Sequence, residues 1–187
     1  MKAKELSFIV LMGAMGNVLG SLTIAPTIFK NVALDFSALP VLVAAVFAGP
    51  LAGAVTGLIA GLLPSLFFGF IGGSLGLLGF SLSVGKALHG LTVGLVVKAL
   101  GLGDRSTLTL IPVVLIGFIP EALWIIATFS LLVPLFLPGL APFMSGLWAP
   151  ILIKATFEVT VMAFFTSTLG GHKGFRAFIT TFKASSA

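Results

Sequence analysis

Five ionisable side chains lie inside long apolar stretches of the chain, where a charge is costly and is therefore a candidate for function: Lys86, His89, Glu121, Lys154 and Glu158. Lys154 and Glu158 are four residues apart, so on a helix they share one face and can pair. Lys86 and Glu121 could pair between two helices. Such pairs would hold the helices together. The same groups could instead form a polar patch in a binding cavity, where the lysines accept a polar or anionic group and the glutamates orient it.

Two further residues, together with His89, are candidates for the same site. Asn17 lies midway along the first apolar stretch, and Asp35 lies in the polar segment that follows it. His89 is one helical turn after Lys86, although a lone histidine on an apolar helix is more often packed and neutral than a ligand. The candidate substrate-binding residues are therefore Asn17, Asp35, Lys86, His89, Glu121, Lys154 and Glu158.

Catalytic signatures are absent from the sequence. It contains no HExxH, GxSxG or P-loop motif and no cysteine. We therefore expect neither an enzyme nor a metal or cofactor site. Without a nucleotide-binding motif, the chain cannot harvest ATP by itself.

The composition indicates a protein whose solvent is lipid. Hydrophobic residues make up 58% of the 187 residues and charged residues only 8%, whereas soluble domains carry about 25% charged residues. So few charges cannot cover a globular surface. The net charge of +5 comes from scattered basic residues, which are typical of topology signals and give no indication of nucleic-acid binding.

The apolar stretches predict an all-α membrane protein of one domain, residues 1–187. A span needs about 20 apolar residues. The predicted stretches are Leu6–Ala25, Ala38–Phe70, Phe80–Leu100, Leu108–Val133 and Leu147–Leu169. Gly49-Pro50 interrupts the second stretch, because proline lacks an N–H and restricts the residue before it. This stretch is either one kinked span, giving five crossings, or a hairpin, giving six.

Basic residues favour six spans with both termini in the cytoplasm. In that arrangement seven of them lie inside and only Lys30 lies outside, as the positive-inside rule requires. The seven are Lys2, Lys4, Lys98, Arg105, Lys173, Arg176 and Lys183. Lys86 and Lys154 then lie at a similar depth below the outer surface. This predicts an outward-facing cavity, closed by the loop Pro26–Ser37 and the connection Gly69–Gly79.

Small residues line one side of the first span. Gly13, Gly16 and Gly20 leave a smooth stripe that allows another helix to approach closely. The stripe is either a docking surface for a partner protein or a contact within the bundle.

Two segments resemble the S components of energy-coupling factor (ECF) vitamin transporters. One runs from Ala33 to Pro40 and contains a D-x-S-x-x-P pattern, and the next, from Ala48 to Leu58, contains G-P-x-x-G. Leu152-Ile153-Lys154 is similar to an L-I-K sequence in several members. The riboflavin-type branch is nearest, although the Lys-Asn pair usual late in its third span is absent here. The helix-1 motif is usually A-x-x-x-A; here Gly16 and Gly20, or loosely Ala14 and Val18, take its place.

The resemblance implies a substrate-capture subunit in the plasma membrane of a prokaryote. Such a subunit binds a vitamin or related micronutrient from outside, with riboflavin as the first candidate. It docks on a membrane coupling subunit that is driven by two ATPase subunits. Two alternatives remain open: a small proton-coupled carrier or channel that works alone, and an intramembrane enzyme on a lipid-linked substrate.

Overall fold

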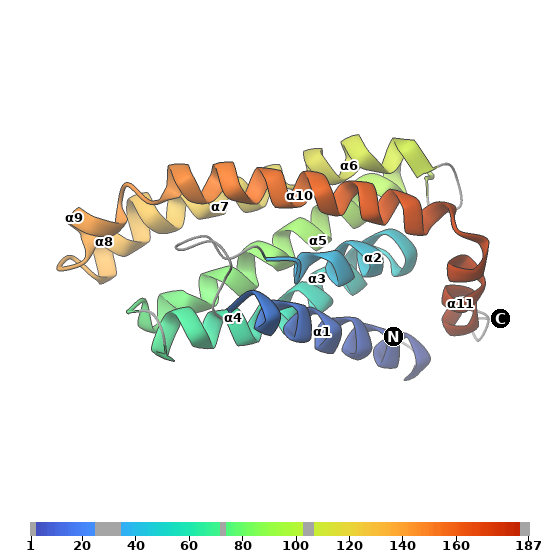
Figure 1. Ribbon diagram of the computed structural model, residues 1–187, viewed down its shortest axis with the longest axis horizontal. Helices are drawn as coiled ribbons and strands as arrows, with labels where there is room; N and C mark the ends of the chain where they lie inside the picture. The colour runs from blue at the N-terminus through green and yellow to red at the C-terminus, as the bar shows by residue number, and fades with distance from the viewer. Residues whose placement is uncertain (1–2, 25–34, 72–73, 103–106, 184–187) are drawn as a thin grey trace.

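The computed structural model of the chain describes residues 3–24, 35–71, 74–102 and 107–183. Every regular element within these residues is helical (Figure 1), which confirms the predicted all-α fold class. The elements are α1 (Ala3–Ile24), α2 (Ala38–Ala48), α3 (Pro50–Ala60), α4 (Leu62–Leu66), η1 (Phe67–Ile71), η2 (Gly76–Phe80), α5 (Ser81–Ala99), η3 (Thr107–Thr109), α6 (Leu110–Gly117), α7 (Ile119–Ala127), η4 (Thr128–Leu132), α8 (Val133–Phe136), α9 (Ala141–Met144), α10 (Trp148–Gly171) and α11 (Lys173–Lys183).

Five helical stretches in the described residues are long and apolar enough to cross a membrane. They are Ala3–Leu22, Pro50–Ile71, Gly76–Ala99, Leu110–Phe136 and Trp148–Gly171. Large apolar side chains such as Leu22, Leu123 and Ile153 are exposed on their outer faces, as expected where lipid is the solvent. The chain is therefore a multi-pass helical membrane protein.

The predicted break at Gly49-Pro50 separates two helices that form a hairpin. Gly49 has a φ of 99°, a left-handed conformation that glycine adopts without steric cost. Pro50 is the first residue of α3, where the missing N–H costs no helical hydrogen bond. A Cβ atom placed on Gly53 would lie 2.7 Å from the Cβ of Ala45, so the residues four positions on either side of Gly49 face each other. The alternative of one kinked helix is therefore excluded.

Helices α3 and α5 approach so closely that only glycine fits between them. A Cβ atom on Gly57 would lie 2.5 Å from the carbonyl oxygen of Lys86, and one on Gly90 would lie 2.4 Å from that of Gly53. Backbones can come this near only where the side chain is a hydrogen atom. This contact fixes α5, and with it Lys86, against the α2–α3 hairpin.

The bundle has two layers that meet at α5 (Figure 1). Helix α1 packs on α2, α3 and α4, and these three pack on α5, while α6, α7 and α10 form the second layer. Helix α2 joins the layers by contacting α10 as well as α3 and α5. The apolar core lies around α2, where Val41, Leu42, Ala44 and Ala45 are fully buried.

One end of the bundle, here called the terminal end, collects both ends of the described chain. Helix α11 contacts the first helix and α10 there (Figure 1), and Phe175 of α11 packs edge-on against Phe47 at the end of α2, with ring centroids 5.6 Å apart. Five basic residues lie in α11, in the first turn of α1 or in the last turn of α5: Lys4, Lys98, Lys173, Arg176 and Lys183. Of the other predicted topology signals, Lys2, Lys30 and Arg105 lie outside the described residues.

Helix α2 occupies only part of the depth of the bundle. Its 11 residues span about 16 Å at 1.5 Å per residue, roughly half the hydrocarbon thickness of a bilayer. The backbone N–H of Asp35, just before α2, bonds to Glu158, which lies ten residues, about 15 Å, into α10. The end of the bundle opposite the terminal end is here called the cavity end. The volume between the start of α2 and the cavity end is therefore not filled by this helix.

Candidate binding cavity

A partly open cavity of about 460 Å³ lies in the space that α2 leaves. Residues of α5, α7 and α10 form most of its wall, and α1, α4 and η1 contribute one or two each. Five of its lining residues are charged: Asp35, Lys86, Glu121, Lys154 and Glu158. The structure thus brings together five of the seven candidate site residues, from four separate parts of the chain.

Lys86 is the centre of the cavity floor. Its buried ammonium group lies 2.6 Å from Oδ2 of Asp35 and also donates to the hydroxyl of Ser37. The N–H of Ser37 donates in turn to Oδ1 of Asp35 over 2.8 Å. Asp35 therefore holds Lys86 to the start of α2.

A second ion pair lies beside the first. Nζ of Lys154 is 3.4 Å from Oε1 of Glu158, which confirms the pair expected from their spacing on one helix. Glu158 also accepts a hydrogen bond from the backbone N–H of Asp35. The two ion pairs are thus linked, and they join α10 to α5 through the start of α2.

Glu121 contacts His89. The sequence had suggested Lys86 as its partner instead. Nδ1 of His89 lies 2.9 Å from Oε2 of Glu121, although the angle is not that of a hydrogen bond. Nε2 of the same ring lies 3.3 Å from the carbonyl oxygen of Val114. Asp35 takes the place expected for Glu121, because the start of α2 lies next to Lys86. Gly85 leaves room for Glu121: a Cβ atom there would lie 3.4 Å from Oε1.

Part of the cavity lining is aromatic. Phe68, Phe118, Trp124 and Phe129 all line it, and the indole N–H of Trp124 donates to the carbonyl oxygen of Ser81 over 3.0 Å. This bond fixes the orientation of the indole ring, which can offer a flat face to a ligand.

Thr128 is a cavity residue that the sequence did not suggest. It lines the cavity and is 1% exposed, and its hydroxyl has no hydrogen-bond partner among the described residues. The spacing Glu121, Trp124, Thr128 places all three on one face of a helix, and this pattern could have revealed both Trp124 and Thr128. Sequence reasoning passed over them because neither side chain is charged.

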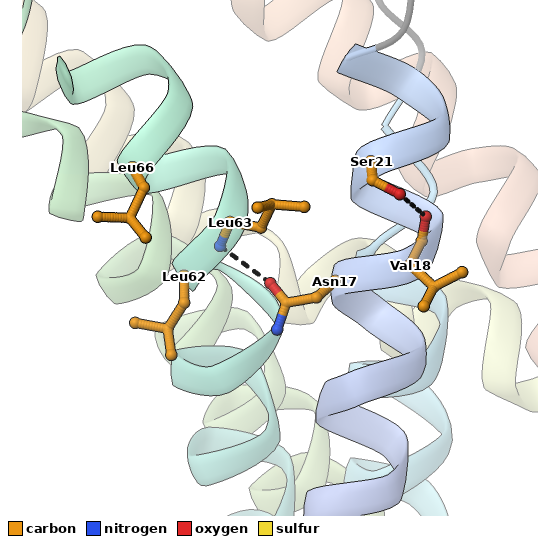
Figure 2. Close-up of a pocket in the computed structure, with 6 residues that line it drawn as sticks. All are labelled: Asn17, Val18, Ser21, Leu62, Leu63 and Leu66. Carbon is orange, nitrogen blue, oxygen red and sulfur yellow. Dashed lines mark hydrogen bonds between the residues drawn. The ribbon is translucent and has the colours of Figure 1, made fainter. Parts of the chain in front are cut away.

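Asn17 does not line this cavity; it bonds to backbone groups that are left unpaired where α3 ends and α4 begins. Its amide bonds to the carbonyl oxygen of Ile59 over 2.8 Å and to the N–H of Leu63 over 2.9 Å, the two groups that an unbroken helix would join to each other. Figure 2 shows Asn17 reaching from α1 to Leu63 across a groove of about 360 Å³ that Val18 and Leu66 also line. His89 likewise does not line the cavity and acts through Glu121.

The glycine stripe of α1 packs inside the bundle. A Cβ atom on Gly13 would lie 2.6 Å from the side chain of Ile59, and one on Gly16 would lie 2.4 Å from Ala60; Gly20 faces Pro64. Of the two readings of the stripe, the internal contact is the one present in the structure. The outward side of α1 carries other residues, including Ala14 and Val18, and Val18 is 61% exposed.

The two segments expected to close the cavity are described in part. Asp35 from the first and Leu75 from the second line the cavity, while residues 26–34 and 72–73 lie outside the described residues. Within the described part of the chain, no three His, Asp or Glu side chains come together as metal ligands.

Comparison of the chain with protein-family models, curated proteins and solved structures gives no match. Function is therefore inferred from the residues of the cavity and from the motifs of the chain.

Proposed function

We propose that this protein is the substrate-capture subunit of an ATP-driven importer of the energy-coupling factor type. The observation that carries the proposal is a cavity at one end of a bundle whose other end is filled by apolar packing around α2. A capture protein needs such a dead-ended cavity, whereas a channel needs a polar path. The volume of about 460 Å³ falls within the usual range of about 300–1,000 Å³ for small-molecule sites. The D-x-S-x-x-P and G-P-x-x-G motifs support the same function.

The proposed topology has six crossings, with both termini on the cytoplasmic side of a prokaryotic plasma membrane. The sixth crossing is the short helix α2 together with the segment before it. The gathering of Lys4, Lys98 and the basic residues of α11 at the terminal end supports this orientation. Tags at the two ends should be accessible from the same face of the membrane, and access from opposite faces would contradict the topology.

Riboflavin is the first substrate to test. The aromatic wall formed by Phe118, Trp124 and Phe129 suits a flat ring system, and the polar floor suits a hydroxylated chain. A bound flavin would give purified protein a visible absorbance band. Mass spectrometry of co-purified small molecules tests the wider class of vitamins and related micronutrients.

The proposed partners are a membrane coupling subunit and two ATPase subunits, because the sequence has no nucleotide-binding motif of its own. Since the glycine stripe is used internally, the outward face of α1 around Ala14 and Val18 is the candidate docking surface. Ala14→Leu should lower uptake in the presence of the coupling module and leave ligand binding unchanged. Gly16→Leu is the matched variant on the inner face, and it should impair folding and binding together.

A reconstitution experiment separates the proposal from its alternatives. The purified protein in lipid vesicles should bind ligand but transport nothing until the coupling subunit and ATPases are added. Transport by the protein alone would favour a proton-coupled carrier, and chemical conversion of a lipid-linked substrate would favour an intramembrane enzyme.

A further inference from the structure

Among the described residues that line the cavity, every charged side chain contacts a group of opposite charge or, for Glu121, a histidine. Lys86 pairs with Asp35, and Lys154 pairs with Glu158. The remaining lining charge, Glu121, is negative and contacts His89. The described lining thus contains two lysines and three carboxylates, and neither ammonium group is left without a carboxylate. An incoming anion would therefore meet no unmatched positive charge among these residues.

One hydroxyl in the cavity wall has no hydrogen-bond partner among the described residues. Thr92 and Thr160 bond to the carbonyl oxygen four residues earlier in their helices. Thr56, Thr128 and Thr166 are buried without such a partner, and of these three Thr128 is the one that lines the cavity. Thr128 begins η4, a π-helical segment, and such segments inside α-helices often occur at functional sites. A buried hydroxyl without a hydrogen bond is costly unless a ligand supplies one.

We infer that the cavity selects an uncharged ligand with a flat ring, that the hydroxyl of Thr128 forms a hydrogen bond to it, and that phosphorylated or carboxylated forms of the same ligand are excluded. This inference rests on the proposed capture function and narrows its substrate class. The aromatic wall supplies the ring contact through Trp124 and Phe129, and Thr128 lies next to Phe129 in the chain. The two ion pairs then serve to hold the floor of the cavity together rather than to attract an anion.

The charge part is tested with pairs of compounds that differ by one phosphate. Binding of riboflavin and riboflavin 5′-phosphate, and of pyridoxine and its 5′-phosphate, is measured by titration of the purified full-length protein. In any pair that binds, we expect the neutral compound to bind at least about tenfold more tightly, because a buried anion without a counter-charge is strongly disfavoured. Equal or tighter binding of a phosphate would overturn the inference and leave the capture function intact. Failure of all four compounds to bind would overturn the inference, and the capture function would be overturned only if no small molecule co-purifies with the protein either.

The Thr128 part is tested with a variant pair of matched chemistry. Thr128→Val removes the hydroxyl at almost constant shape. Thr166→Val does the same on α10, where Thr166 is also buried without a partner for its hydroxyl but does not line the cavity. We expect Thr128→Val to weaken binding of the neutral compound roughly five- to a hundredfold and Thr166→Val to leave it unchanged. Normal binding by Thr128→Val, or equal losses in both variants, would overturn the role of Thr128.

Discussion

The two halves of the bundle differ in what lies between their long helices. Around α2, at the terminal end, glycines bring helices into backbone contact and apolar side chains fill the space between the layers. At the cavity end, the same long helices continue without α2 between them, and charged and aromatic side chains line an open volume. The difference shows that one short helix divides the molecule into a packed half and a binding half, and that the ion pairs lie at the boundary between them.

The largest expected effect comes from removing one charge at this boundary. Asp35→Asn leaves the buried ammonium group of Lys86 without a counter-charge, and breaking a buried pair in this way costs about 3–5 kcal/mol. We expect the lower end of this range, because the Asp35 side chain is 28% exposed. Thermal unfolding in detergent measures the loss. The double variant Asp35→Asn with Lys86→Gln should regain most of the stability, and a double variant as unstable as Asp35→Asn would contradict the pairing.

In the packed half, a single methyl group should be strongly destabilising. The Cβ of Gly57→Ala would lie 2.5 Å from the carbonyl oxygen of Lys86, so α3 and α5 must separate. Overpacking of this kind costs about 1–3 kcal/mol, and backbone contact places this site near the upper value. Gly139→Ala is the control, because nothing lies within 4 Å of a Cβ atom there. Equal unfolding temperatures for the two variants would refute the close contact.

In the binding half, a loss of affinity is expected in addition to a loss of stability. Lys154 lines the cavity with its side chain 31% exposed and has spare N–H donors beyond its contact with Glu158. A hydrogen bond to a charged group is worth about 1.5–3 kcal/mol, so Lys154→Ala should weaken ligand binding roughly ten- to a hundredfold. It also leaves the buried Glu158 without its counter-charge, so the unfolding temperature should fall as well. Lys173→Ala in α11 is the matched control. If Lys154→Ala binds normally, this lysine is structural.

The sequence predicted the helices well because hydrophobic length and glycine-proline breaks are local properties. The turn at Gly49-Pro50 and the pair Lys154–Glu158 both follow from short spacings. The partner of Lys86 could not be predicted in this way. It depends on how far α2 extends into the bundle, which brings Asp35 rather than Glu121 to the ammonium group.

The roles of Asn17 and the glycine stripe depended on the direction that α1 faces. A polar side chain in an apolar helix suggested ligand binding, yet Asn17 satisfies the backbone of α3 and α4. A smooth stripe suggested a partner, yet Gly16 contacts Ala60. Periodicity shows which residues share a face of a helix, but the neighbour that covers this face is decided by tertiary packing.

The shortness of α2 also sets the thickness of the barrier that a captured molecule would still have to pass. A ligand that rests against the first turn of α2 has about 16 Å of protein between itself and the terminal end, the length of 11 helical residues. The hydrocarbon layer around the protein is about 30 Å thick. Binding alone would thus carry the ligand across roughly half of the insulating layer, and any energy-driven step would have to open only the remaining plug formed by α2 and its close-packed neighbours.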